Sequence, residues 1–348
     1  MADTLTTLLE RLRRSRIIDL IGLALVGLVF LWLVVNFVKT PAEFVNVGLI
    51  GVTNGAIYGV VALGYTLIYG ILQLINFAHG DVFALSGLVA STVIVSLVGL
   101  DESSSVIAIV GGLIVAMVIV MVLFAAVNST IELVAYRRLR SAPRLAALIT
   151  AIGMSFIVQN VALALYDVDF RSVPEFIPRT PVVEIGTITF AWNKLTALLI
   201  VVPVLLVLTW FVQTTRQGKA MRAVSQDPEA SAMMGINVNR TISVAFAIAG
   251  SLAGAAGIVY LLQFNIRYDT GFELGLIAFT AAVLGGIGNL SGAVLGALLI
   301  GFIQAFNEGL TWAAPGSDWT RSIVFGILIA ILVFRPEGLL GERTPEGA

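Results

Sequence analysis

Long apolar runs recur along the whole of this 348-residue chain. A helix needs about 20 apolar residues to cross a hydrocarbon core of ~30 Å, and runs of about 18 or more occur repeatedly here. Only 12% of the residues are charged and 58% are hydrophobic, whereas soluble domains are usually about 25% charged. A membrane β-barrel would show ~10-residue segments of alternating polarity instead. The sequence therefore predicts an all-α fold, a polytopic bundle of about eight to ten transmembrane helices.

The apolar runs set the expected order of the chain. Four arginines precede the first run, which is too long for the apolar region of a cleaved signal peptide. We expect a cytoplasmic N-terminal segment 1–16, one transmembrane domain 17–335 and a cytoplasmic tail 336–348. Ten crossings are predicted at residues 17–38, 44–70, 82–99, 106–135, 145–166, 194–213, 241–264, 274–287, 291–308 and 320–334.

Lysine and arginine are divided unequally between the two sets of connectors. With ten crossings, 14 of the 20 basic residues lie on the side of both termini and 6 lie on the other side. Because basic residues concentrate in cytoplasmic connectors, both termini and the polar segment 214–240 are expected in the cytoplasm. The outer loop 167–193 is either a docking surface for an extracytoplasmic protein or a plain connector.

The composition disfavours several classes of protein. With no cysteine and a single histidine, His79, the chain is expected to hold neither a disulfide nor a metal cluster. Acids other than Asp81 and Glu132 are scarce in the apolar spans, although proton- or sodium-driven carriers usually need them. No motif suggests an enzyme, a voltage sensor or a nucleic-acid-binding protein. A channel, an ion-coupled carrier and a membrane scaffold remain as alternatives from other classes.

A first polar interruption separates two apolar runs near residues 76–81. One interpretation is structural: Gly80 permits a bend, and Asp81 is the N-cap of a helix that begins near Val82. The other is a direct role in a path through the membrane, because an ionised Asp must face protein, water or the interface. The candidate path residues here are Asn76, His79, Gly80 and Asp81.

A second, glycine-rich interruption lies at residues 285–292. Non-helical backbone at membrane depth persists only where it is buried in protein or lines a cavity. This interruption is therefore either a turn between two helices or a part of the path. The candidate path residues here are Gly285, Gly286, Gly288 and Asn289.

Glycines at four-residue spacing predict close contacts between helices, since small residues let backbones approach in lipid. These glycines are expected to face other helices or the path. They are Gly51, Gly55 and Gly59, then Gly250 and Gly254, and finally Gly288, Gly292 and Gly296.

The polar segment contains a short helix with clear start and stop signals. Asp227 can accept free amide hydrogens, Pro228 suits the first helical position, and Glu229 favours the positive end of the helix. Gly235 is a suitable stop. Ala230, Met233 and Met234 then share one face. That face packs either on the protein's own helices or in the groove of a partner, for which pliable methionine is suited.

The segment resembles the cytoplasmic coupling loop of ATP-binding-cassette import permeases. Glu229-Ala230-Ser231 followed by Gly235 stands in place of E-A-A-x-x-x-G, with Ser at the third position. Three further stretches resemble branched-chain amino acid permeases of the LivH type, and together they cover most of the chain beyond about residue 44. They are GVTNGAIYGVVALGYTLIYGILQLINFAHGD (51–81), FTAAVLGGIGNLSGAVLGALLIG (279–301) and RPEGLLG (335–341).

The resemblance implies a transport subunit of the cell membrane that works by alternating access. Its implied partners are a second, related permease, two cytoplasmic ATPases and an extracytoplasmic substrate-binding protein. No cofactor is expected in this chain, because it lacks a G-x-x-x-x-G-K-[ST] phosphate loop and the ATPases would bind ATP and Mg. The implied coupling segment includes Asp227, Pro228, Glu229, Ala230, Met233, Met234 and Gly235. The implied substrate is a branched-chain or other hydrophobic amino acid or, as in close relatives, urea or a short-chain amide.

Overall fold

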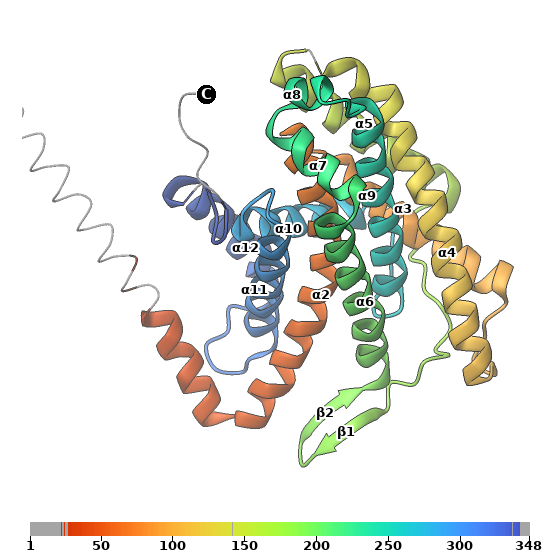
Figure 1. Ribbon diagram of the computed structural model, residues 1–348. Coiled ribbons are helices and arrows are strands. Elements are labelled where there is room, and N and C mark those ends of the chain that lie inside the picture. Colours follow the sequence, from red (N-terminus) through yellow and green to blue (C-terminus); the bar gives the residue numbers. More distant parts are fainter. Residues whose placement is uncertain (1–21, 23, 25–26, 141, 336, 342–348) are drawn as a thin grey trace, which may run out of the picture.

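A bundle of long helices forms the body of the molecule in the computed structural model, which describes all residues except 1–21, 23, 25–26, 141, 336 and 342–348 (Figure 1). Within this described part, eight helices are long and apolar enough to cross a membrane. They include α2 (Pro41–Leu72), α3 (Ala78–Thr92) with its π-helical end η1 (Val93–Val98), α4 (Val106–Ile131) with η2 (Glu132–Tyr136) and η3 (Arg137–Leu139), α5 (Arg144–Tyr166), α6 (Trp192–Thr214), α9 (Val238–Leu261), α11 (Leu290–Gly309) and α12 (Ser317–Phe334). The predicted helical membrane fold is confirmed.

Two shorter apolar helices correspond to the other predicted crossings. The helix Gly27–Lys39 covers the second part of the expected span 17–38, whose beginning lies outside the described residues. Helix α10 (Thr270–Gly285) has 16 residues, which is roughly 24 Å at ~1.5 Å per residue. It is therefore shorter than a typical hydrocarbon core, as the break that follows it predicts.

The elements outside the spans gather at opposite ends of the bundle. Helices α7 (Arg216–Gln226) and α8 (Pro228–Met233) lie at one end (Figure 1). An antiparallel hairpin of β1 (Pro181–Ile185) and β2 (Ile188–Ala191) lies at the other. The hairpin belongs to the loop 167–193, and the small sheet that it adds is not predicted by the apolar pattern of the sequence.

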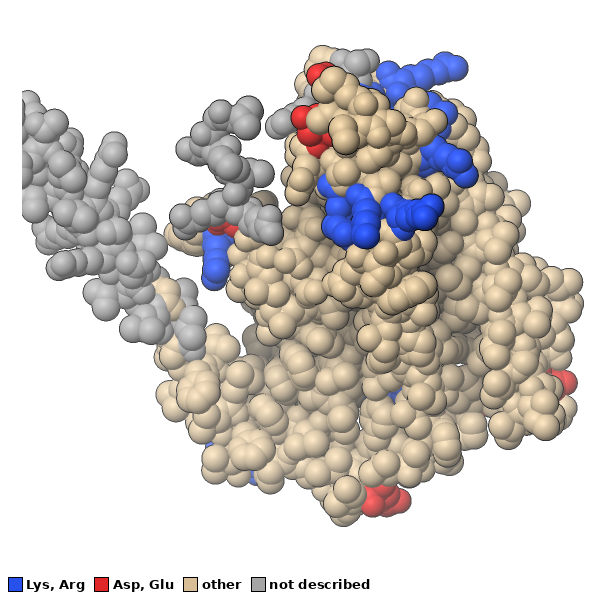
Figure 2. All heavy atoms as spheres, in the orientation of Figure 1, with Lys and Arg blue, Asp and Glu red and all other residues tan. Residues whose placement is uncertain are grey.

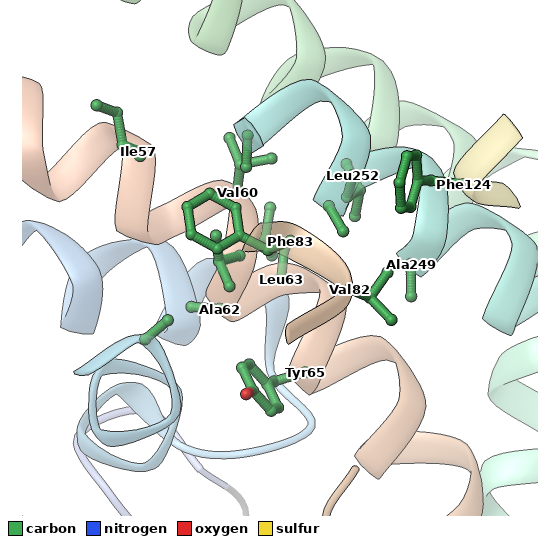
Figure 3. Packing of buried hydrophobic residues seen from close by; sticks show 14 of the residues in the cluster. Ile57, Val60, Ala62, Leu63, Tyr65, Val82, Phe83, Phe124, Ala249 and Leu252 are labelled. Carbon is green, nitrogen blue, oxygen red and sulfur yellow. The ribbon is translucent and has the colours of Figure 1, made fainter. Parts of the chain in front are cut away.

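Helices α2, α3 and α9 form the centre of the bundle. The buried share of their most apolar stretches is 83%, 67% and 72%, against 11–22% for α4, α5, α6 and α12. Figure 3 shows side chains of the central helices interdigitating with Phe124 of α4. The outer helices turn large apolar side chains away from the protein, which is the arrangement expected where lipid is the solvent.

Glycines bring pairs of helices into backbone contact, as their spacing predicts. A Cβ atom added at Gly55 of α2 would lie 2.7 Å from the Cα of Leu298 in α11. One added at Gly254 of α9 would lie 3.1 Å from the carbonyl oxygen of Val120 in α4. Gly288 differs, because a Cβ there would meet no described atom within 4 Å. It lies in a turn instead of a helix contact.

The first break differs from its structural interpretation. Helix α2 ends at Leu72, where Gln73 adopts a left-handed conformation, and α3 already begins at Ala78. Asp81 therefore lies inside the first turn of α3 and is not its N-cap; that prediction is wrong. Gly80 is helical too, and its role is close packing: an added Cβ would lie 2.8 Å from the Cα of Gly275 in α10.

Candidate coupling helix and translocation cleft

Helix α8 begins and ends as its sequence signals predict. The carboxylate of Asp227 accepts a hydrogen bond from the amide of Ala230 at 2.9 Å, and Pro228 occupies the first helical position. The chain leaves the helix through Gly235, whose φ of 83° suits glycine. The result is a six-residue helix between α7 and α9, too short to be stable alone in water.

The methionine face of α8 points away from the protein. Met233 and Met234 are 83% and 84% exposed, and Glu229 is exposed beside them. The opposite side of the helix is anchored by Ser231, which is buried. Of the two interpretations of this face, packing on the chain's own helices is therefore excluded for both methionines.

Helix α7 fixes the position of α8 against the membrane helices. Its first amides are capped by Thr215, whose hydroxyl accepts from the amide of Gly218 at 3.0 Å. The guanidinium of Arg222 donates to the carbonyl oxygens of Val212 and Gln213 at the end of α6. The prediction of a single helix in this polar segment leaves α7 out, although the sequence carries a signal for it: a Thr cap followed by the apolar residues Met221 and Val224 in an otherwise polar stretch.

Basic side chains gather at the end of the molecule that carries α7 and α8. Figure 2 shows most of the visible Lys and Arg residues there. Arg140, near the N-terminus of α9, is among the basic residues of this end, and burial lowers its pKa against the opposing effect of Glu132. An arginine so placed keeps its charge. The folded molecule thus has the charge asymmetry on which the predicted topology rests.

An open cleft of about 480 Å³ lies between α7 and the second break. Its walls come from the ends of α2 and α6, from one side of α7, and from the turn between α10 and α11. They combine apolar and polar side chains, including Thr66, Leu67, Ile71, Gln213, Met221, Arg222, Ser225, Gln226, Ile287, Gly288, Asn289, Leu290 and Ser291. A surface of this mixed kind suits a small molecule with both a charged and an apolar part.

The second break is a tight turn from Gly286 to Asn289. Gly286 and Gly288 have φ values of 107° and 95°, which only glycine adopts readily. Asn289 caps α11 by accepting from the amide of Gly292 at 2.9 Å. Gly285 packs against α11, where an added Cβ would lie 2.7 Å from the amide nitrogen of Ala293. The break is thus a turn between two helices. Because residues of this turn also border the cleft, the second interpretation, a part of the path, stays open as well.

The C-terminal stretch covers the same turn. The amides of Leu339 and Leu340 donate to the carbonyl oxygens of Leu284 and Gly285 at 2.8 and 2.9 Å. The Asn289 side chain donates in return to the carbonyl oxygen of Leu340 at 2.8 Å. Residues 337–341 of the expected tail are therefore docked on the second break.

The residues of the first break are buried and lie outside the cleft. The carboxylate of Asp81 accepts from Gln159 of α5 at 3.2 Å and also from Ser155. The ring of His79 packs edge-on against the ring of Tyr65, with 4.8 Å between the ring centroids. Within the described structure, neither ring nitrogen of His79 has a hydrogen-bond partner. The structure thus brings only Gly288 and Asn289 of the candidate path residues to the open cleft.

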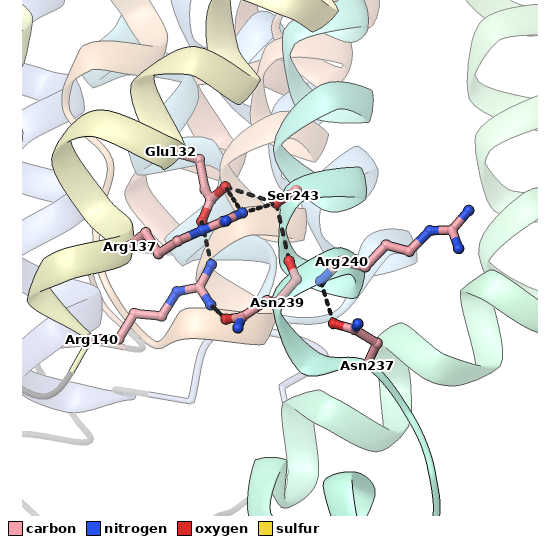
Figure 4. Close-up of polar contacts among 7 residues, drawn as sticks. All are labelled: Glu132, Arg137, Arg140, Asn237, Asn239, Arg240 and Ser243. Atoms are coloured by element: carbon pink, nitrogen blue, oxygen red, sulfur yellow. Dashed lines mark hydrogen bonds and ion pairs between the residues drawn. The ribbon is translucent and has the colours of Figure 1, made fainter.

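An ion-pair cluster around the buried side chain of Glu132 lies where α4 meets the start of α9 (Figure 4). Glu132 has no exposed side-chain surface and pairs with Arg137 at 3.1 Å and with Arg140. Ser243 of α9 donates to the same carboxylate at 2.8 Å. In the sequence Glu132 stands out only as a rare acid, although the two arginines five and eight residues later are a signal for its partners.

Removing the cap of α8 tests whether this helix is formed locally. Asp227→Ala is expected to cost about 1 kcal/mol of helix stability. Amide exchange at Met234, whose amide donates to the carbonyl oxygen of Ala230 at 3.1 Å, should then speed up roughly fivefold, because the helix opens more often. Asp227→Asn is the control, since it keeps the accepting oxygen. Equal exchange in all three proteins, measured by hydrogen–deuterium exchange, would contradict the assigned cap.

The fold and the cleft define a class of protein: a polytopic helical protein with eight candidate membrane spans in its described part, an open cleft, and an exposed, capped helix at one end of the bundle. A family model described as the branched-chain amino acid transport system permease component matches residues 48–333. Since this match covers most of the sequence, the chain belongs to that family. The resemblance seen in the sequence is confirmed, and the chain is a transport component without catalytic chemistry of its own.

Curated relatives align over nearly their whole length. The high-affinity branched-chain amino acid transport system permease protein BraD of Pseudomonas aeruginosa is 35% identical, with 85% of this chain and 95% of the relative covered. The LivH proteins of Salmonella typhimurium and Escherichia coli K12, which carry the same description, are 37% and 36% identical at the same coverage.

Proposed function

We propose that this chain moves branched-chain amino acids inward across the cell membrane as one permease subunit of an ATP-driven importer. Family membership and the names of its relatives support the substrate class. The cleft supports it as well, because its lining offers both apolar and polar groups to a small zwitterion with an apolar side chain.

The energy enters through α8. A short helix with a charged start and two exposed methionines is suited to a complementary groove. This groove belongs to a cytoplasmic ATPase subunit. The transporter has two such subunits, and they bind ATP and Mg. ATP-driven closure of the ATPases moves α8, and the permease alternates between outward-open and inward-open states. The observation that carries this mechanism is the exposure of Met233 and Met234.

The remaining partners follow from the topology. The end with α7, α8 and most basic residues is cytoplasmic, as are the two termini. The hairpin end then faces outward and receives substrate from a binding protein. A second, related permease completes the path. In this arrangement the cleft beside Gly288 is the cytoplasmic end of the path, and Asn76, His79, Gly80 and Asp81 lie deeper along it.

Reconstitution with all partners tests the proposal. The chain, its second permease and the ATPases are placed in liposomes that enclose ATP, with the binding protein outside. Labelled leucine should accumulate only with ATP and with the binding protein. Accumulation of urea or acetamide in place of leucine would move the chain to another substrate of the same family. Leucine uptake driven by a proton or sodium gradient without ATP would overturn the proposal.

A further inference from the structure

The start of α9 is tied directly to the coupling helix. The amide of Ile236 donates to the carbonyl oxygen of Ser231 in α8 at 3.0 Å. One residue later, Asn237 caps α9 by accepting from the amide of Arg240 at 3.0 Å (Figure 4). Between the two helices there is thus a short, hydrogen-bonded corner instead of a flexible linker. A displacement of α8 is therefore expected to displace the first turn of α9.

The first two turns of α9 are tied in turn to the ion-pair cluster around the buried Glu132. Arg140 donates to the side-chain oxygen of Asn239 at 2.5 Å. Ser243 accepts from Arg137 at 2.7 Å and donates to the Glu132 carboxylate at 2.8 Å. Glu132 has no exposed side-chain surface. Separating its carboxylate from these partners would therefore leave a buried charge without water or a counter-ion, which is strongly destabilising. The cluster is therefore expected to move as a unit with α9.

The same segment reaches the first break from its other side. Residues 132–136 form the π-helical segment η2, a local irregularity often found at functional positions. Four residues after Glu132, the hydroxyl of Tyr136 donates to the side-chain oxygen of Asn76 at 2.7 Å. Tyr136 is 1% exposed, and its ring packs on the ring of Phe246 in α9, with 5.5 Å between the ring centroids. One short segment thus contacts both the start of α9, which follows the coupling helix, and the break between α2 and α3.

We propose that η2 is the mechanical link between the coupling helix and the first break, with Glu132 and Tyr136 as its positioning residues. Movement of α8 shifts the start of α9, the ion-pair cluster carries η2 with it, and Tyr136 then moves Asn76. Coupling between distant sites runs through contiguous packed and hydrogen-bonded elements of this kind. The inference rests on the proposed function, because it assigns a route to the ATP-driven movement.

Two mild substitutions weaken the link at its two ends without leaving a buried charge unpaired. Ser243→Ala removes the hydroxyl between α9 and the ion pair, and Tyr136→Phe removes only the hydroxyl that binds Asn76. Each should lower the number of leucine molecules imported per ATP hydrolysed by at least about fivefold. A fivefold change is the lower end of the effects that allosteric coupling typically produces. The basal ATPase rate and the yield of assembled complex should stay at the wild-type level. If Ser243 and Tyr136 only stabilised the fold, their substitution would lower that yield.

Each variant has a matched control. Ser251→Ala removes another α9 hydroxyl that bonds α4, to the carbonyl oxygen of Met121 at 3.2 Å. Tyr58→Phe removes another buried tyrosine hydroxyl, which binds Gln304 at 2.6 Å. Both controls should keep the wild-type ratio of import to hydrolysis. The Ser243→Ala/Tyr136→Phe double variant should lose no more than the worse single variant, because both interrupt one route.

The full reconstituted complex separates the two levels of the proposal. If the wild-type complex imports no leucine with ATP, the proposed function itself fails. If the wild-type complex couples normally and Tyr136→Phe or Ser243→Ala keeps the wild-type ratio, the link through η2 is overturned. Equal losses in the matched controls, or losses that multiply in the double variant, would overturn it as well.

Discussion

Glu229→Arg is expected to abolish ATP-dependent uptake while the chain still inserts and folds. Glu229 is exposed next to the free methionine face of α8 and makes no contact that holds the bundle together among the described hydrogen bonds and ion pairs. Placing the wrong sign of charge in an interface costs several kcal/mol, so uptake should fall by roughly 100-fold or more. Uptake of labelled leucine and the amount of protein in the membrane are measured in parallel.

Two control substitutions test whether the loss of uptake is specific to docking. Glu229→Gln keeps the shape of the side chain without reversing its charge and should lose less. Glu102→Arg reverses an exposed acid in the connector between η1 and α4 and should leave uptake unchanged. ATP-driven uptake at the normal rate in Glu229→Arg would show that α8 does not dock on the ATPases.

Gly288→Leu is expected to block transport by filling the cleft. A Cβ at this position would meet open space, and the residue borders the cleft of about 480 Å³. The leucine side chain would therefore project into the path. The φ of 95° also penalises any side chain, by on the order of 1–3 kcal/mol. Uptake should fall at least about tenfold below that of Gly288→Ala, a difference of ~1.4 kcal/mol or more.

The comparison with alanine separates blockage from backbone strain. Gly288→Ala carries the same penalty for its positive φ but adds only one carbon. Both variants should assemble with their partners to the same extent, as judged by co-purification. If the two variants import leucine equally well, the cleft beside Gly288 is not part of the path.

The sequence was sufficient for features that depend on local chemistry. The apolar runs located the membrane helices, and Asp227, Pro228 and Gly235 located α8 within one or two residues. Such signals are local, because a cap or an apolar stretch acts on its own few residues. The exposure of the methionine face, by contrast, could be learned only from the structure.

Features that depend on tertiary contacts were missed or misread. Asp81 looks like a helix cap in the sequence, but the structure places it inside α3, where Ser155 and Gln159 of a distant helix bind it. The link through η2 depends on Ser243, more than a hundred residues beyond Glu132. Neither pairing leaves a periodic pattern, since the partners meet only after the helices have packed.

Cross-linking from α8 tests the central claim, that ATP-driven movement enters the permease through this helix. The chain has no cysteine, so Met233→Cys provides a unique attachment point for a benzophenone maleimide. In the assembled transporter, illumination should join this chain to an ATPase subunit, and Glu102→Cys should give no such product. Labelling of Met233→Cys by an impermeant reagent from outside the cell, or its cross-linking to the binding protein, would contradict the account.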